Sequence, residues 1–487
     1  FVVIMANNKS LIQDAKGKEL FDSNISAIQY ALKEEIQKNK FEPRLFTDLA
    51  TVHTIRYIID EQDIDKDLSI AYIKQAISLT PDRPQYYNLL SESYVIFNEP
   101  EKAIQAAIAV MRHGRLHRYN VVAGETAETV LLEKEFADSC GAKYCLAVAS
   151  GGYALTTALR ASGIHRNDIV LTNAFTLAPV PGAIQGAGGR PVFVEITKNL
   201  VLDLDDLKKK IKSTNAKFLM LSHMRGHLVD MEALISITNE AGIKVIEDCA
   251  HTMGANWNGV PSGRSGVVGC FSTQTFKHIN SGEGGFLVTD DAEIMAKATM
   301  LSGSYMLYES HLAGAPVEAF ENVRLDTPNC SGRMDNLRAA ILRPQLADLS
   351  IQAERWNKRY RALEIGLNQV EDISLTSRPS KEYFVASSFQ FCLPKFTQNQ
   401  IKDFVLGCDL RGVQLKWFGA SIPVGFTSKH DSWRYVDKQN LPETDKILSV
   451  LLDMRIPLTF SLEDCDTICK IIKEEVKKIS SNQVLDS

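Results

Sequence analysis

One lysine stands between two short apolar runs, and its surroundings favour covalent chemistry. Lys277 follows the apolar residues around Phe271 and precedes a glycine-rich turn, after which Gly285 opens a second run typical of a β-strand. Rigid backbone on both sides would fix the amine. A lysine that is partly desolvated, or that lies beside another cation, loses its proton readily and can form a Schiff base. Most lysines are exposed charges, so Lys277 alone leaves a surface hairpin as the commoner interpretation.

Two further groups of residues could hold an anion and a ring nitrogen. Ser150 is followed by Gly151 and Gly152 at the start of a helical pattern, and the free N–H groups of a helix N-terminus suit a phosphate. Asp248 ends an apolar run and His251 follows closely, so the carboxylate could pair with a cationic ring nitrogen. Each pattern alone is weak, because many helices begin with Ser-Gly and an acid at a strand end is more often a helix cap.

The three features occur in the order phosphate cradle, strand-end aspartate and hairpin lysine. Together they are the parts needed to hold pyridoxal 5'-phosphate, whose ring acts as an electron sink. Lys277 would form the imine, Asp248 would keep the pyridine nitrogen protonated, and the turn at Gly151 and Gly152 would anchor the phosphate. The sequence therefore predicts an enzyme that uses this cofactor.

Alternating strands and helices would bring these residues together. From about residue 118, helical stretches alternate with short β-rich runs. This alternation predicts an α/β fold with a mostly parallel sheet covered by helices on both faces. In such sheets ligands bind at the carboxyl ends of the strands. The runs that we interpret as strands begin at Tyr144, Asp168, Pro191, Phe218 and Lys244.

Residues 1–115 differ in composition and predict an N-terminal all-α region. Glycine occurs there only at positions 17 and 114, and apolar residues recur at three- and four-residue spacing. The segment 81–114 resembles one tetratricopeptide repeat, preceded by a degenerate one. Fewer than three such repeats cannot form a free-standing solenoid, so a docking or dimer-bracing module and a plain helical bundle are equal alternatives. The repeat-like positions are Tyr87, Leu90, Ser91 and Tyr94, then Ala103, Ala107 and Val110.

As a set, the motifs between residues 118 and 343 resemble the DegT/DnrJ/StrS aminotransferases, often called sugar aminotransferases, which have the type I fold of pyridoxal-phosphate enzymes. This resemblance implies a large cofactor-binding domain within residues 116–345, a smaller α+β domain within residues 346–487, and a homodimer. The motifs that carry it are Ser150-Gly151, Pro191-Val-Phe-Val-Glu, His223-Met-Arg-Gly226, Glu247-Asp248-Cys-Ala-His251, Phe271-Ser272 shortly before Lys277, Gly282-Glu-Gly-Gly285, Arg333-Met334 and Ala339-Ala340.

The resemblance also implies roles for single residues. Gly152, Tyr153 and Ser272 would hold the phosphate, together with an asparagine from the second subunit. His251 would lie beside the ring, near its phenolate oxygen. Lys277 would be the imine lysine.

Two of the implied contacts are ambiguous in this chain. The family's Asn-Tyr-Arg-Met motif is replaced by Asn329-Cys-Ser-Gly-Arg-Met, so either Asn329 or Ser331 would reach the phosphate across the dimer. For the aromatic ring that covers the cofactor, counting back from Pro191 gives Leu177. Phe175 lies on the same strand face and is the aromatic alternative.

Lys277 also distinguishes two reactions within the family. One branch removes hydroxyl groups and carries histidine where the lysine belongs, whereas this chain has Lys277 followed by His278. A histidine can move a proton but cannot form the imine. The resemblance therefore implies an aminotransferase, with glutamate or glutamine as donor and a keto group, expected on a nucleotide-linked sugar, as acceptor. Two alternatives stay open: a non-sugar ketone or aldehyde of a secondary pathway, and an idle site on a scaffold that docks a partner protein through residues 1–115.

The overall composition argues against several other classes. With 54 basic and 59 acidic residues, the formal net charge of −5 leaves no electrostatic footprint for nucleic acid. No run approaches the length of a membrane span, and the short apolar start does not predict a signal peptide. The nine cysteines are scattered without a C-x-x-C pair, so we expect neither zinc nor disulfides, and a cytoplasmic location.

One C-terminal stretch departs from what the family leads us to expect. Lys416-Trp-Phe-Gly-Ala-Ser is rich in aromatic residues. It could line the substrate site, although packing within the small domain is the commoner use of such side chains.

Overall fold

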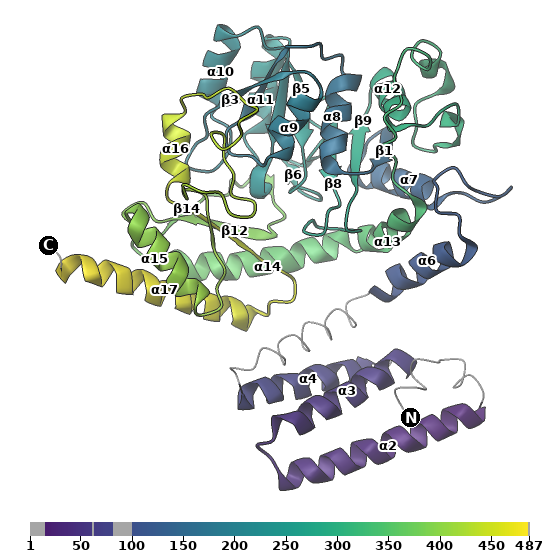
Figure 1. Cartoon of the computed structure of the whole chain (residues 1–487), viewed down its shortest axis with the longest axis vertical. Coiled ribbons are helices and arrows are strands. Elements are labelled where there is room, and N and C mark those ends of the chain that lie inside the picture. Colours follow the sequence, from purple (N-terminus) through teal and green to yellow (C-terminus); the bar gives the residue numbers. More distant parts are fainter. Residues whose placement is uncertain (1–14, 61–62, 81–99, 486–487) are drawn as a thin grey trace. The chain divides into compact units, whose positions relative to one another are not determined.

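The computed structural model describes residues 15–60, 63–80 and 100–485, and the chain divides into two compact units, residues 1–105 and 106–487 (Figure 1). The described part of the first unit is helical, as predicted. It comprises α2 (Ala15–Lys38), α3 (Pro43–Asp60), α4 (Asp63–Leu79) and the start of α6 (Pro100–His113). Most of the tetratricopeptide-like segment, including Tyr87, Leu90, Ser91 and Tyr94, lies outside the described residues.

Apolar packing joins α3 to α4. Phe46 of α3 and Ala76 of α4 are buried, with Tyr72 and Ile77 against them. A buried polar contact adds to this packing, because Nδ1 of His53 lies 2.6 Å from Oδ1 of Asp65. These helices thus have a core of their own.

A seven-stranded sheet forms the centre of the second unit, in the order β1-β9-β8-β5-β4-β2-β3. Neighbours from β8 to β3 are parallel, and β9 runs antiparallel to both β8 and β1. The predicted, mostly parallel sheet is therefore confirmed. Its strands are β1 (Tyr144–Val148), β2 (Ile169–Asn173), β3 (Arg190–Val194), β4 (Phe218–Ser222), β5 (Lys244–Asp248), β8 (Val268–Ser272) and β9 (Gly285–Thr289).

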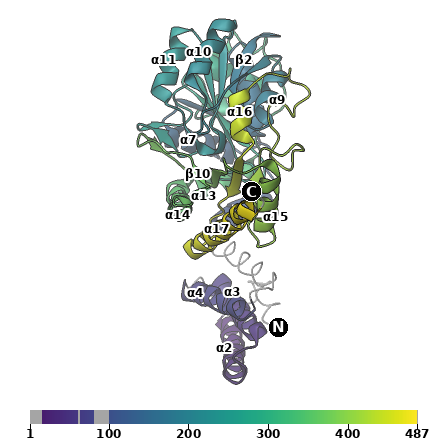
Figure 2. The ribbon, with the colours of Figure 1, turned by 90° about the vertical axis from the view of Figure 1, so that its left-hand side faces the viewer.

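Helices cover both faces of this sheet, as Figures 1 and 2 show. Successive side chains of a strand point to opposite faces, so Met220 packs with α8, α9 and α12, while Leu219 packs with α10 and α11. Because both faces are apolar, β4, β8 and β9 are buried along their whole length. The covering helices are α7 (Glu128–Cys140), α8 (Gly151–Ala161), α9 (Pro179–Gly186), α10 (Leu204–Ser213), α11 (Met231–Glu240), α12 (Ala292–Ser302) and α13 (Asn336–Ala347).

A smaller α+β region follows in the chain. Its four-stranded antiparallel sheet has the order β10-β12-β14-β13, and its core includes Leu363, Phe391, Phe404, Leu452 and Ile472. The elements are α14 (Leu349–Leu367), β10 (Ser374–Leu375), β12 (Ser388–Cys392), α15 (Gln398–Asp409), β13 (Lys416–Trp417), α16 (Pro442–Leu448), β14 (Leu451–Arg455) and α17 (Leu462–Leu485).

A three-stranded sheet joins the two regions, since β11 (Glu382–Tyr383) pairs with β6 (Asn256–Trp257), which also pairs with β7 (Val260–Pro261). Short 3-10 helices lie at Met224–Gly226 (η2), Tyr308–Ser310 (η3) and Val317–Phe320 (η4). None of the described helices is long and apolar enough to cross a membrane.

Candidate active site

Lys277 lies in the turn between β8 and β9 and is partly buried. Its Nζ is 2.9 Å from Nε2 of His251. Burial lowers the pKa of Lys277 to about 7; the nearby Asp248 carboxylate opposes this shift, and the cations Arg225 and Arg455 add to it. Near neutral pH a large fraction of this amine is therefore unprotonated, which is the form that attacks a carbonyl.

The hydrogen bonds of His251 support the same protonation state. Its Nδ1 accepts the backbone N–H of Arg225 at 3.3 Å. A neutral imidazole carries one proton, which must then be on Nε2. Burial, together with the nearby Lys277 and Arg225 charges, lowers the pKa of His251 well below its ordinary value, so the ring is neutral. The Nε2–H group is thus the donor and the Lys277 nitrogen the acceptor.

Asp248 ends β5 close to this amine. The hydroxyl of Ser222, which is opposite Asp248 in the β4–β5 register, donates to Oδ2 at 3.1 Å, and the N–H of Ala250 donates to Oδ1 at 3.2 Å. Burial raises the pKa of Asp248, whereas the Lys277 charge and these hydrogen bonds oppose the rise. The carboxylate is fixed in orientation and remains available to a cationic partner.

The α8 cradle, formed by the backbone of Gly151 and Gly285 and the side chain of Ser272, lies where β1, β8 and β9 meet. Gly285 is opposite Val148 in one register and opposite Ser272 in the other. A Cβ on Gly151 would lie 2.7 Å from Cβ of Ser272, and one on Gly285 would lie 2.8 Å from the backbone nitrogen of Gly151. Only glycine permits this close approach, which places the N-terminus of α8 beside the Ser272 hydroxyl.

The first turn of α8 leaves donors for an anion. Ser150 caps the helix, because its Oγ accepts the N–H of Tyr153 at 3.1 Å. The N–H groups of Gly151 and Gly152 have no acceptor within the helix. The space beside Gly152 is open, because the nearest atom to an added Cβ would be Cβ of Pro179, at 3.8 Å. This open helix end fits a phosphate, as the sequence predicted.

Tyr153 was expected to hold the phosphate, but both of its hydrogen-bond donors are already used within this chain. Its backbone N–H goes to Ser150, and its hydroxyl donates to the carbonyl of Leu301 at 2.8 Å. A Cβ on Gly332 would meet the tyrosine ring at 2.0 Å, so ring and backbone are in close contact. Within this chain, Tyr153 anchors the segment around Gly332.

Asn329 and Ser331 lie on that same segment. Oδ1 of Asn329 accepts both the N–H and the hydroxyl of Ser331, at 3.0 and 3.2 Å. Both residues are exposed, and Ser331 has a left-handed backbone with φ 50°. Their role across a dimer stays a prediction.

The two residues proposed to cover the cofactor ring differ in exposure. Phe175 is 1% exposed and packs edge-on against Phe418, with ring centres 5.1 Å apart. Leu177 lies at the margin of the same apolar cluster and is partly exposed. Leu177 is thus the more accessible of the two.

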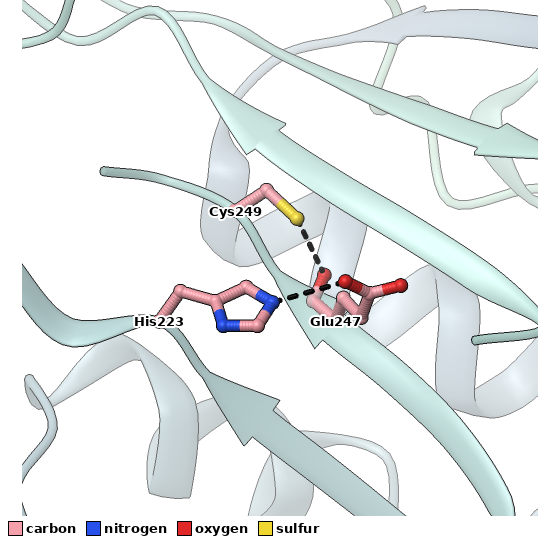
Figure 3. A group of neighbouring side chains, drawn as sticks. All are labelled: His223, Glu247 and Cys249. Carbon is pink, nitrogen blue, oxygen red and sulfur yellow. Dashed lines mark hydrogen bonds and ion pairs between the residues drawn. The ribbon is translucent and has the colours of Figure 1, made fainter. Parts of the chain in front are cut away.

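His223, Glu247 and Cys249 form a buried group at the ends of β4 and β5 (Figure 3). Glu247 is surrounded by donors: Nε2 of His223 at 3.0 Å and the backbone N–H groups of residues 263, 265 and 266 at 3.0, 2.8 and 2.7 Å. Burial raises the pKa of Glu247, but these hydrogen bonds and His223 bring it below its ordinary value. Because protein donors already occupy the carboxylate, this group braces β5 and is not a good metal site.

Sequence reasoning named the motif that holds Arg225 and the stretch that begins at Lys416, but it did not bring them together with Arg455 as one charged group close to Lys277. Arg225, Lys416 and Arg455 gather around Asp453, and they come from η2, β13 and β14. A register between two strands of the small sheet brings Lys416 to Asp453. No local sequence signal indicates such a pairing.

The groups brought together fit pyridoxal phosphate. The open N-terminus of α8 with Ser272 suits the phosphate, Asp248 suits the ring nitrogen, and the neutral amine of Lys277 suits the aldehyde. The close contacts at Gly151 and Gly285 require glycine at both positions, because an added Cβ would clash with Ser272 or with the backbone of Gly151.

Two curated relatives are similar over part of the chain. The chain is 28% identical over 280 residues to L-glutamine:scyllo-inosose aminotransferase of Streptomyces griseus. It is 34% identical over 260 residues to dTDP-3-amino-3,6-dideoxy-alpha-D-galactopyranose transaminase of Aneurinibacillus thermoaerophilus. The similar regions cover 57% and 52% of this chain and 65% of each relative, so the chain spans just under two thirds of these relatives' length.

The fold matches solved structures over most of the second unit. The E. coli GDP-4-keto-6-deoxy-D-mannose-3-dehydratase with bound hydrated PLP superimposes with a TM-score of 0.65 at 20% identity, covering 76% of this chain and 96% of that chain. At this identity the likeness shows the shared fold alone.

The family follows from a match that extends beyond these segments. Residues 99–473 match the DegT/DnrJ/EryC1/StrS aminotransferase family, and they contain the α8 cradle, Asp248 and Lys277. The chain therefore belongs to the DegT/DnrJ/EryC1/StrS aminotransferase family, whose cofactor is pyridoxal 5'-phosphate.

Proposed function

We propose that this protein is an aminotransferase that moves an amino group from an amino acid to a keto group on a sugar or sugar-like ring. The observation that carries the proposal is the geometry of the Lys277 amine, which lies 2.9 Å from Nε2 of His251 in the same site as Asp248 and the α8 cradle. A dehydratase of this family would carry histidine at this position. The two curated relatives, one named for an inosose and one for a dTDP-linked amino sugar, support the acceptor class.

The chain's own residues would divide the work. When bound, the cofactor supplies an electron sink and an aldehyde. Lys277 would hold that aldehyde covalently and, once displaced, would carry a proton between carbon atoms. Asp248, oriented by Ser222, would keep the ring nitrogen protonated. His251 would keep the Lys277 amine unprotonated and aligned.

Several finer features belong to the same proposal. Glutamate or glutamine is the expected donor, and a nucleotide-linked keto-sugar the expected acceptor. The active form is a cytoplasmic homodimer in which Asn329 or Ser331 of the second subunit reaches the phosphate. Residues 1–115 are a helical module that contacts a partner protein or braces the dimer.

A screen of substrate pairs tests the proposal. The purified protein, saturated with pyridoxal phosphate, is mixed with glutamate or glutamine, and the cofactor absorbance is followed; a keto-sugar is then added. We expect one donor to change the spectrum and an acceptor to restore it. Lys277→Ala should abolish both changes, whereas Lys208→Ala, an exposed lysine of α10, should abolish neither. A protein that stays colourless would favour a scaffold with an idle site.

A further inference from the structure

Three cationic side chains gather around one aspartate near the reactive lysine. Nη2 of Arg225 lies 2.7 Å from Oδ2 of Asp453, and Nζ of Lys416 lies 4.0 Å from the same oxygen. Lys416 is opposite Asp453 in the β13–β14 register, and Arg455 lies two residues further along β14, on the same strand face. Within the described ranges, Asp453 is the single carboxylate that forms an ion pair with Arg225 or Lys416, and its charge also acts on Arg455. Three positive charges therefore face one negative charge.

The cation cluster, defined as Arg225, Lys416 and Arg455, adjoins the amine of Lys277. The backbone N–H of Arg225 donates to His251, whose other ring nitrogen contacts Lys277. The guanidinium carbon of Arg455 lies 3.7 Å from the ring centre of Phe276, the residue before Lys277. The cluster thus contacts His251, which lies against the amine, and Phe276, which precedes Lys277 in the chain.

Polar atoms of the cluster are buried without hydrogen-bond partners. They are Nε and Nη2 of Arg225 and Nζ of Lys416, together with Oδ2 of Asp453. The 2.7 Å contact of Arg225 with Asp453 is an ion pair whose angles fall outside hydrogen-bond geometry. Arg225 is 4% exposed. A buried cation normally finds hydrogen-bond acceptors for its N–H groups, so donors that have only an ion pair beside a reactive amine favour a ligand site.

Two partly exposed aromatic rings pack against the cluster. Phe276 and Phe426 are 48% and 45% exposed, and their centres lie 6.3 Å apart. Nζ of Lys416 lies 5.6 Å from the Phe426 ring centre. Burial lowers the pKa of Lys416 to about 8, and the neighbouring arginines oppose its charge. A bound anion would relieve that repulsion.

We propose that Arg225, Lys416 and Arg455 bind an oxyanion, a carboxylate or phosphate group, of the substrate that reacts at Lys277. This inference rests on the proposed function, because it takes the reacting group to be a substrate. The expected cofactor-phosphate site is built separately, from the N-terminus of α8 and Ser272. The oxyanion has two chemical sources: the carboxylate of the amino donor, or the phosphate of a nucleotide-linked acceptor.

Binding of two unreactive probes to the cofactor-saturated protein tests the proposal. Glutarate represents the donor's carboxylates, inorganic pyrophosphate represents the acceptor, and calorimetry measures the dissociation constants. The variants are Lys416→Met and Arg455→Met, which remove one charge each. Lys395→Met, an exposed lysine of the same region that pairs with Glu371 and Asp372, is the matched control. Lys416→Arg restores the charge.

We expect at least one probe to bind, and each cluster variant to weaken that binding about tenfold or more, as the loss of a charge-assisted hydrogen bond implies. Lys395→Met and Lys416→Arg should bind like the original protein. Loss for glutarate identifies the donor as the source, and loss for pyrophosphate identifies the acceptor.

The proposal is overturned if neither probe binds, or if both cluster variants bind as tightly as the control. Retained cofactor absorbance and circular dichroism show which variants are folded. If Lys416→Met does not fold, the binding measured with Arg455→Met decides the test. Binding requires no turnover, so an inactive protein that still shows the predicted losses would refute the proposed function and leave the oxyanion site standing.

Discussion

The lowered pKa of Lys277 predicts how fast the cofactor-free protein captures pyridoxal phosphate at different pH values. An ordinary lysine has a pKa of 10.5, and burial brings that of Lys277 to about 7. At pH 7 about half of the amine is then neutral, against roughly one molecule in 3,000 for an ordinary lysine. The structure therefore predicts about a thousandfold more reactive amine at neutral pH.

Stopped-flow absorbance of cofactor capture between pH 5.5 and 9.5 measures this midpoint. Because deprotonation produces the reactive form, the rate should rise with pH and level off above the pKa, with a midpoint near 7. Asp248→Asn removes the negative charge that opposes the shift, so its midpoint should be lower. A rate that still climbs through pH 9 would refute the conclusion that burial has deprotonated Lys277.

Three further predictions concern the groups around this amine. Gly151→Ala should weaken cofactor binding, because its Cβ would lie 2.7 Å from Ser272. The matched change Gly186→Ala, whose Cβ meets nothing nearer than 3.8 Å, should leave cofactor binding unchanged. Equal cofactor affinities of the two variants would contradict a phosphate site at the N-terminus of α8. Glu247→Gln should destabilise the protein by about 1–3 kcal/mol, because an amide nitrogen would face backbone donors. An unchanged denaturant midpoint would argue against a purely structural carboxylate, and so would a lowered midpoint that recovers when a metal is added. Lys277→Met should remove a pH dependence of the free energy of unfolding. Between about pH 7 and the ordinary lysine pKa, the amine is protonated in the unfolded chain and neutral in the folded one, so it makes the free energy of unfolding rise with pH. Parallel pH profiles of thermal unfolding for the two cofactor-free proteins would exclude the effect.

Local patterns in the sequence were enough to predict the sheet and to nominate the central residues of the candidate site. Each strand of the large sheet is a short apolar run that ends in turn residues, so the residues at or after the ends of β1, β5 and β8 could be identified from the pattern. Ser150, Asp248 and Lys277 follow from that reading, because parallel strands bring their carboxyl ends to one edge.

The rest depends on contacts between residues far apart in the chain. Phe175 is enclosed by Phe418, and Lys416 meets Asp453 only through the register of two strands. Tyr153 donates to Leu301, 148 residues later. No periodicity carries such information. The break between α13, which ends at Ala347, and α14, which begins at Leu349, is likewise not marked by periodicity. There the apolar pattern continues across the break, so only Asp348, the shared cap, marks it.

Borohydride reduction of the cofactor-loaded protein, followed by peptide mass mapping, tests the central claim most directly. The account predicts that the reduced cofactor is attached to the peptide containing Lys277, and that Lys277→Met leaves no lysine labelled in stoichiometric amount. Stoichiometric labelling of another lysine, or a coloured protein in which Lys277 stays unmodified, would contradict it.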